Sequence, residues 1–316
     1  MRKILVPVLV ALGIFSLVLA GLLRFYAPSR VEKAPLDLLV PQQAATGPAK
    51  VYNVQAGKLE DVQLKATRQV VTDSAASDSK VAVLQVTLCI VKVIDDPPFC
   101  GDGPKDPRIV RVIVDRAPAD RKTGLAVNGS KYGENIDGAP IKHVGLTYKF
   151  PFHSKKTTYK FFDVNSKLAA DARFIGTDKV KGLNTYKYEA VIDKVPLEVA
   201  GGVPGVYSDT RTVWVEPRTG AIVKGTQHQV RTTTAGTLVF EADLAFTDAT
   251  IDHQSKLAKD GLSKLRLLTV FGPLTLLLVA LLAFAGAFLL YRRRTGGDGH
   301  RARAGEPSFS ATAPPR

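Results

Sequence analysis

Two cysteines, Cys89 and Cys100, are the first candidates for chemistry in this sequence, because they are its only thiols. Between them, residues 95–98 read Asp-Asp-Pro-Pro, a turn-forming run that could bring the two side chains together. In an oxidising compartment such a pair forms a disulfide, so we predict one here, with two free buried thiols as the alternative. With two cysteines and five scattered histidines, we expect neither a metal site nor a cofactor.

The sequence contains no recognisable catalytic constellation. It has no G-x-S-x-G elbow, no H-E-x-x-H zinc motif, no P-loop, no G-x-G-x-x-G loop and no EF-hand loop. His143, His153 and His228 could carry protons, but none lies in a recognisable catalytic setting, so a structural role is the better interpretation of each. We therefore expect no catalytic residue and no enzymatic activity.

Residues 148–163, YKFPFHSKKTTYKFFD, combine aromatic side chains with lysines. Aromatic side chains bury large areas, so one interpretation is a hairpin that anchors the core. The functional alternative is an apolar groove with a basic rim, which would suit an acyl chain with an anionic head group. The candidate groove residues are Tyr148, Phe150, Phe152, Tyr159, Phe161 and Phe162.

Two uncharged apolar runs, residues 4–23 and 267–290, lie near the ends of the chain. About 20 apolar residues in a helix cross the ~30 Å hydrocarbon core of a bilayer, so each run predicts a transmembrane helix. A buried core helix is rarely this long without a charge. The first run could instead be a cleaved signal peptide, but it exceeds the usual apolar region of such peptides, so we expect an uncleaved anchor.

Basic residues flank these runs on the side of the chain termini. The residues expected to set the topology are Arg2, Lys3, Arg292, Arg293 and Arg294. Cytoplasmic flanks of membrane helices carry the excess of Lys and Arg. We therefore expect a protein of the cytoplasmic membrane with both termini in the cytoplasm and residues 25–266 outside.

The formal net charge of +14 divides into two parts. Residues 1–24 and 292–316 hold nine basic and two acidic residues, so half of the surplus belongs to the membrane flanks. The remainder makes the outer part mildly basic, which favours membrane lipids with anionic head groups as partners. Nucleic acid is not an expected partner of an extracytoplasmic domain.

The pattern between the apolar runs is typical of antiparallel β-structure. Residues 81–94 alternate apolar and polar side chains, and glycines and prolines interrupt the later strand candidates at short intervals. No long amphipathic helix occurs before about residue 249, which argues against βαβ units. The expected fold class is an α+β membrane protein, in which a mainly antiparallel, β-rich extracytoplasmic domain is flanked by two transmembrane helices.

These observations predict the following organisation. The segments are a cytoplasmic N-terminus (1–3), a first transmembrane helix (4–23), an extended linker (24–50), a β-rich extracytoplasmic domain (51–246), a juxtamembrane helix (247–266), a second transmembrane helix (267–291) and a disordered basic cytoplasmic tail (292–316).

Two segments of the β-rich region resemble each other. Residues 111–129 read RVIVDRAPADRKTGLAVNG, and residues 211–225 read RTVWVEPRTGAIVKG. Each combines an apolar strand, an acidic residue, a basic residue, Thr-Gly and a short apolar return, which is typical of a β-hairpin. They are either two independent hairpins or parts of two related β halves.

Taken together, RTVWVEPRTGAIVKG, the DRKTG turn, the F-P-F-x₅-T-Y-x-F-F-D run and the two end helices with a C-terminal arginine cluster resemble an actinobacterial family of two-helix membrane proteins, the porin PorA family. The resemblance covers nearly the whole chain. It implies residence in an actinobacterial cell envelope, and its name implies a pore. Two uncharged helices are typical of a cytoplasmic membrane, whereas an outer-membrane pore is a closed barrel with alternating lipid-facing residues.

Three functions remain open at this point. The first is an envelope protein whose outer domain binds or transfers a lipid or another hydrophobic ligand; the layout of end helices around a β-rich domain also resembles class B scavenger receptors. The second is a non-catalytic scaffold that binds envelope proteins or polymers. The third is a pore built from several copies of the chain.

Overall fold

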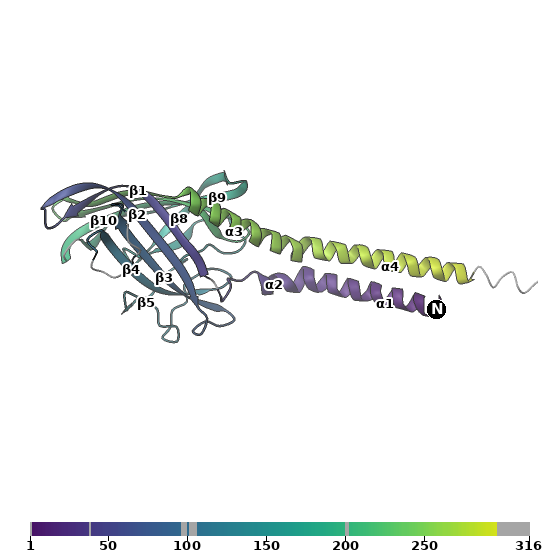
Figure 1. Cartoon of the computed structure of the whole chain (residues 1–316). Helices are drawn as coiled ribbons and strands as arrows, with labels where there is room; N and C mark the ends of the chain where they lie inside the picture. The colour runs from purple at the N-terminus through teal and green to yellow at the C-terminus, as the bar shows by residue number, and fades with distance from the viewer. Residues whose placement is uncertain (1, 38, 96–99, 101–105, 200–201, 296–316) are drawn as a thin grey trace, which may run out of the picture. The chain divides into compact units, whose positions relative to one another are not determined.

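The computed structural model describes residues 2–37, 39–95, 100, 106–199 and 202–295. The chain separates into two compact units, one within residues 1–31 and 264–316 and the other within residues 32–263. The first, here called the helical unit, contains helices alone among its described residues, and the second, the sheet unit, is mainly a β-sheet (Figure 1).

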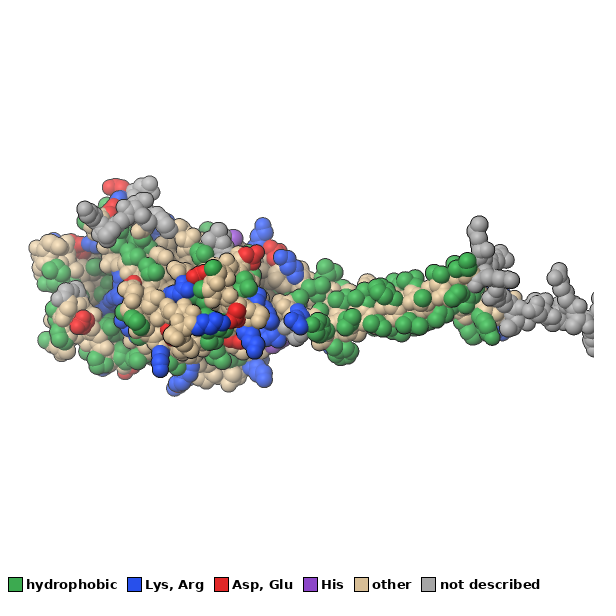
Figure 2. Space-filling view, turned by 90° about the horizontal axis from the view of Figure 1, so that it is seen from below, with side chains coloured by type: hydrophobic (Ala, Val, Ile, Leu, Met, Phe, Trp, Pro, Cys, Tyr) green, Lys and Arg blue, Asp and Glu red, His purple; other side chains and the backbone are tan. Residues whose placement is uncertain are grey.

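Two helical runs make up the helical unit. The N-terminal run consists of α1 (Arg2–Gly21), a π-helical turn η1 (Leu22–Tyr26) and α2 (Ala27–Val31), and the C-terminal run of η4 (Leu267–Phe271) and α4 (Gly272–Thr295). Both are long and apolar enough to cross a membrane, and only 17% of the most apolar window of each is buried. Core helices of soluble proteins are mostly buried, so the two expected apolar helices are confirmed as candidates to span a bilayer (Figure 2).

Close packing joins α1 to α4. A Cβ atom at Gly13 would lie 2.7 Å from the ring of Phe284, so only glycine fits at this crossing. Other small side chains are buried in the same unit: Ser16, Ala20, Ala280, Ala283 and Ala287. Small residues let helix backbones approach each other in lipid, where packing replaces the hydrophobic effect as the driving force.

The sheet unit contains twelve strands among its described residues. Their bounds are β1 (Leu39–Asn53), β2 (Lys58–Asp73), β3 (Val81–Lys92), β4 (Ile109–Asp120), β5 (Asn135–Ile136), β6 (Ala139–Pro140), β7 (Tyr159–Asp163), β8 (Leu168–Val180), β9 (Leu183–Val199), β10 (Val203–Glu216), β11 (Ala221–Thr233) and β12 (Leu238–Phe246).

All twelve strands form one sheet in the order β6-β5-β4-β3-β2-β1-β12-β11-β10-β9-β8-β7. Every neighbouring pair is antiparallel, which confirms the predicted fold class. The sheet therefore consists of two meanders, β1–β6 and β7–β12, which are joined where β1 pairs with β12.

The sheet curls until its two ends meet. Ile113 of β4 and Ile136 of β5 pack against Phe162 of β7, although these strands lie at opposite ends of the strand order. Isolated bridges complete the closure: Ala119 pairs with Ala126, Leu125 with Leu146, and Leu146 with Phe161. The loop between β6 and β7 thus fills the gap between the two edges, which would otherwise present unpaired backbone groups.

The range 24–50 differs from the expected extended linker. It is helical to Val31 and then enters β1 at Leu39. Its Pro and Ala content does not predict a strand. β1 is held by long-range pairing with β2 and β12 and not by local propensity. Gly47 shows how close this pairing is, since a Cβ there would lie 1.8 Å from the carbonyl oxygen of Asp243.

The two similar sequence segments form equivalent turns. After β4, the Asp120 carboxylate accepts hydrogen bonds from the backbone N–H groups of Lys122 and Thr123 and from the Thr123 hydroxyl. After β10, the Glu216 carboxylate accepts the corresponding bonds from Arg218 and Thr219. In both turns a glycine with positive φ, Gly124 or Gly220, ends the loop and begins the return strand.

A second pair of turns is also alike. Between β1 and β2, the Asn53 side chain accepts bonds from the N–H groups of residues 55 and 56; between β7 and β8, the Asp163 carboxylate accepts bonds from Ser166. The two pairs occur in the same order along the chain, after β1 and β4 in one meander and after β7 and β10 in the other. This order favours two related halves over two independent hairpins.

Helix α3 (Asp248–Arg266) occupies the range expected for a juxtamembrane helix. Within the sheet unit, its residues Ala258 and Leu262 pack against Trp214 and Val223 on the outer face of the sheet. The indole N–H of Trp214 donates to Asp178 at 2.9 Å. This packing covers one side of the second meander and leaves its other face for the interior.

A disulfide joins Cys89 of β3 to Cys100 in the structure, with the two Cα atoms 5.8 Å apart. Cys89 is buried and pairs with Thr67 of β2 and Val112 of β4, so it lies in the middle of the first meander. The bond ties the segment that follows β3 to this rigid point.

Replacing Gly220 by alanine should destabilise the sheet unit more than replacing Gly236. Both glycines have positive φ, which costs a non-glycine residue about 1–3 kcal/mol. At Gly220 the new Cβ would also lie 2.0 Å from the carbonyl oxygen of Phe150, whereas nothing lies within 4 Å at Gly236. We expect this overlap to add about 1–3 kcal/mol to the loss at Gly220.

Urea unfolding of the detergent-solubilised chain, followed by Trp214 fluorescence, would measure both losses. Equal destabilisation by Gly220→Ala and Gly236→Ala would show that the turn does not hold the loop that contains Phe150.

Candidate functional site

A cavity of about 130 Å³ lies inside the curled sheet and is partly open to solvent. Its wall comes from β1–β4 of one meander, from β7 and β10–β12 of the other, and from the loops around Thr147 and Val164. Since both meanders contribute, the cavity depends on the closure of the sheet.

Apolar side chains form most of the wall. They are Ala45, Ala66, Val86, Leu88, Ile90, Ile113, Phe161, Phe162, Val164, Val213, Ile222, Leu244 and Phe246. A smaller set of polar side chains lines the same space: Gln43, Arg68, Asp115, Thr147, Tyr148, Asn165, Arg211, Thr226, Gln227 and Gln229. Small-molecule sites typically combine an apolar lining with a few convergent polar groups.

Asp115 of β4 organises one part of the wall. Its carboxylate accepts a hydrogen bond from His143 Nε2 at 2.8 Å and another from the hydroxyl of Tyr148. Asp115 and His143 are both about 1% exposed, so this carboxylate is removed from water and relies on these two partners. Burial first, and then the Asp115 charge, raise the pKa of Tyr148, which keeps its hydroxyl protonated as a donor.

Arg211 of β10 belongs to a buried charge cluster. Its Nη2 atom lies 3.0 Å from Asp163 Oδ1 and 3.4 Å from Asp209 Oδ2. Burial alone would lower the pKa of Arg211, but the two carboxylates outweigh this effect and raise it. Burial raises the pKa of Asp209, with Arg211 opposing the change. The charge of Arg211 is therefore compensated within the protein.

Arg68 of β2 differs from Arg211. Its Nε atom donates to Gln43 Oε1 at 2.9 Å, its Nη2 atom donates to the same oxygen, and its guanidinium lies 5.6 Å from the ring centroid of Tyr148. Among the described residues, no carboxylate lies within salt-bridge distance of it. Burial, together with the charge of Arg211, lowers the pKa of Arg68 to about 10, so the side chain stays protonated at neutral pH.

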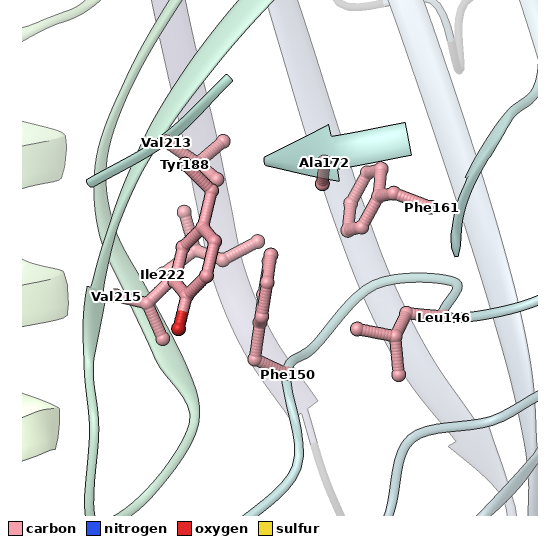
Figure 3. Close-up of a cluster of buried hydrophobic side chains, with 8 residues drawn as sticks. All are labelled: Leu146, Phe150, Phe161, Ala172, Tyr188, Val213, Val215 and Ile222. Carbon is pink, nitrogen blue, oxygen red and sulfur yellow. The ribbon is translucent and has the colours of Figure 1, made fainter. Parts of the chain in front are cut away.

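The candidate groove aromatics divide between the cavity and the core. Tyr148, Phe161 and Phe162 line the cavity. Phe150 is fully buried beside it, with its ring centroid 4.6 Å from that of Tyr188 and 5.6 Å from that of Phe161 (Figure 3). The segment therefore serves as core and as cavity wall at once.

The remaining two aromatics lie away from the cavity wall. Tyr159 packs edge-on against Phe150, with 5.5 Å between ring centroids. Phe152 lies under the amine of Lys149, which is 3.7 Å from the ring centroid and donates to the carbonyl oxygen of Thr219. None of the lysines of this segment lines the cavity, so they do not form a basic rim around it.

The histidines lie in three separate places. His143 is buried on Asp115, His153 bonds Glu32 at 2.9 Å, and His228 bonds Asp243 at 2.8 Å. In the part of the chain that the structure describes, no three His, Cys, Asp or Glu residues are grouped so that they could hold a metal ion.

The topology residues lie at the outer ends of the two helical runs. Arg292 and Arg293 are exposed at the end of α4. The side chains of Arg2, Lys3 and Arg294 lie outside the described residues. Residues 292–295 of the expected disordered tail (292–316) are helical, because α4 continues to Thr295, and the rest of that range lies outside the described residues.

The sequence analysis missed Arg68, although the alternation of its strand contains a signal. In β2 the buried residues Leu64, Ala66 and Val70 occupy every second position, and Arg68 falls on their face of the strand. A charged residue at an apolar-face position costs stability unless it has a partner, so it marks a candidate site.

The fold and site together define a class: a β-sheet protein with an internal, mostly apolar cavity, attached to two helices that are long enough to cross a membrane. A family model described as "Porin PorA" matches residues 6–289. The chain therefore belongs to the porin PorA family, which the sequence resemblance had predicted.

Two relatives carry the same name. A "Porin PorA" of Corynebacterium amycolatum is 26% identical over 200 residues, which cover 48% of this chain and 50% of the relative. Another "Porin PorA", of Corynebacterium resistens, is 23% identical over 235 residues, which cover 62% of this chain and 54% of the relative. The chain thus spans about half the length of these curated relatives.

Removing the charge of Arg211 should destabilise the fold strongly. In Arg211→Met, the carboxylates of Asp163 and Asp209 would remain buried without their cation, which typically costs about 3–5 kcal/mol. Lys160→Met is the matched control, because it removes an ion pair with Asp171 whose side chains are 58% and 43% exposed. Exposed pairs contribute about 0–1 kcal/mol.

Urea unfolding of the two variants would give the difference in free energy of unfolding. A loss for Arg211→Met as small as that for Lys160→Met would mean that the Asp163 and Asp209 carboxylates are hydrated or protonated in the native protein.

Proposed function

We propose that this protein is a membrane-anchored envelope protein, without catalytic activity, whose sheet unit binds a hydrophobic ligand in its internal cavity. The observation that carries the proposal is the cavity itself, which is mostly apolar, partly open and lined by strands of both meanders. A scaffold protein would gain nothing from such a space, because unfilled volume in a core costs stability.

The volume of the cavity limits the size of the ligand that it can enclose in the described structure. An engineered apolar cavity of about 150 Å³ in another protein binds benzene, so 130 Å³ fits a similar number of atoms. A longer chain would have to extend through the open side. A short apolar molecule, or the first part of an acyl chain, matches this volume.

The surface of the sheet unit supports the proposal that this unit lies in water beside a membrane. Figure 2 shows Lys, Arg, Asp and Glu side chains over the outside of this unit, whereas hydrophobic side chains cover the helices. With the basic residues that flank the apolar runs, this distribution supports a cytoplasmic-membrane protein with both termini in the cytoplasm and the sheet unit outside. The ligand would then come from the membrane or from the surrounding envelope.

Purification in zwitterionic nanodiscs, followed by solvent extraction and mass spectrometry, tests this function. We expect a hydrophobic compound in stoichiometric amount with the wild-type chain. Ala66→Leu fills part of the cavity and should reduce the recovered amount several-fold, because Ala66 is buried in the wall. Ala235→Leu adds the same atoms on an exposed loop and should leave the amount unchanged.

Two outcomes would contradict ligand binding. One is repeated recovery of the wild-type chain without any enriched compound, which would favour a scaffold. The other is an equal amount of compound in both leucine variants, which would place the compound in the surrounding lipid and not in the cavity.

The family name supports a second candidate, an oligomeric pore. Two apolar helices per chain could enclose a channel only if several copies assembled. Steady conductance of the purified chain in planar bilayers would favour this candidate. If no conductance develops over a range of protein concentrations, the pore is excluded for the protein acting alone.

A further inference from the structure

We infer that the cavity recognises the anionic head group of its ligand, a carboxylate or a phosphate, which is bound by Arg68 with Arg211 and Thr147. This inference rests on the proposed ligand-binding function and adds the chemical class of the ligand.

The positive charges of the two arginines are compensated to different extents. Arg211 has two carboxylates within 3.4 Å, whereas Arg68 has the amide oxygen of Gln43 and the face of Tyr148. A partly buried cation without a carboxylate is costly, because its desolvation is not repaid by a charge pair. Gln43 engages Nε and Nη2, so Nη1 of Arg68 remains available to a ligand.

The second argument is the proximity of the two cations. Arg68 and Arg211 line the same cavity, and the charge of Arg211 contributes to the lowered pKa of Arg68. Like charges repel strongly where little water screens them. An anion in the cavity would attract both guanidinium groups and relieve this repulsion, whereas a neutral ligand would leave it in place.

A third observation concerns Thr147. It is 3% exposed and lines the cavity, yet its hydroxyl has no hydrogen-bond partner in the described part of the chain. Buried hydroxyl groups nearly always have a partner, so one without a partner at a cavity wall indicates a place for a ligand atom or water. The oxygen atoms of a carboxylate or phosphate would accept a bond from it.

The carboxylates of the region have hydrogen-bond donors other than Arg68. Asp115 is bonded to His143 and Tyr148, and Asp163 to Arg211 and Ser166. Asp209 is bonded to Gln227. Each acidic group already has donors, so Arg68 is the charged side chain that remains for the ligand. The apolar side chains of the cavity wall, such as Ala66 and Phe246, would contact the hydrophobic tail of the ligand.

Three probes with the same alkyl chain test this inference: octanoate, 1-octanol and octyl phosphate. Binding to the full chain in phosphatidylcholine nanodiscs is measured by titration calorimetry, with empty nanodiscs subtracted. We expect octanoate to bind at least tenfold more tightly than octanol, in line with a hydrogen bond to a charged group. Tighter binding of octyl phosphate than of octanoate would equally support the anion site and would assign it to a phosphate head group.

Variants show which side chain produces the preference for an anionic head group. Arg68→Met should abolish the preference for octanoate over octanol. Arg68→Lys keeps a cation and should retain part of the preference, which protects the test if the methionine variant folds poorly. Arg173→Met is the matched control, because Arg173 is exposed on β8 and lies outside the cavity wall.

The possible failures are distinguishable. Equal binding of octanoate and octanol to the wild-type chain would overturn the head-group inference and leave hydrophobic ligand binding intact. A preference that survives Arg68→Met would also overturn it. If none of the three probes binds, the ligand-binding function itself fails.

Discussion

Closure of the curled sheet depends on the loop between β6 and β7, which the two equivalent turns hold in place. A Cβ atom at Gly124 would lie 2.6 Å from the carbonyl oxygen of Lys149, and one at Gly220 would lie 2.0 Å from the carbonyl oxygen of Phe150, so neither position accepts a side chain. Backbone bonds join Thr147 to Gly124 and Phe150 to Gly220. Held at these two points, the loop places Leu146 against β7 and Tyr148 against Asp115, and the interior forms as a consequence.

The composition of that interior carries an energetic cost. Asp115, Asp163 and Asp209 are buried and Arg68 and Arg211 are partly buried, and a purely apolar filling is often at least as stable as such a charge cluster. The fold recovers much of the cost by giving the carboxylates several donors each. Arg68 is the side chain for which this recovery is least complete, and the proposed ligand site is placed there for this reason.

How much of this could be predicted from the sequence depends on the range of the interactions involved. The apolar helices, the antiparallel sheet and the paired DRKTG and EPRTG turns follow from local patterns. Strand β1 does not, because Ala44, Gly47 and Pro48 disfavour a strand locally and are held in one by pairing with β2. The cavity could not be predicted from the sequence either, because it forms only where β2, β10 and the loop at Tyr148 come together in the fold. The aromatic run marked the right region, but the alternation of β2 identified the more specific residue, Arg68.

The same interior bears on the family name. A water-filled lumen would hydrate its arginines, and their pKa values would stay near the usual range. In this chain burial lowers the pKa of Arg68, and apolar side chains such as Phe161 and Phe246 form most of the surrounding wall. The loop with Phe150, stacked on Tyr188, fills the space beside the cavity with a solid core. The interior that the structure describes is therefore a packed core with a small cavity, so the proposed pore, which needs several copies, would take its path from the assembled helices.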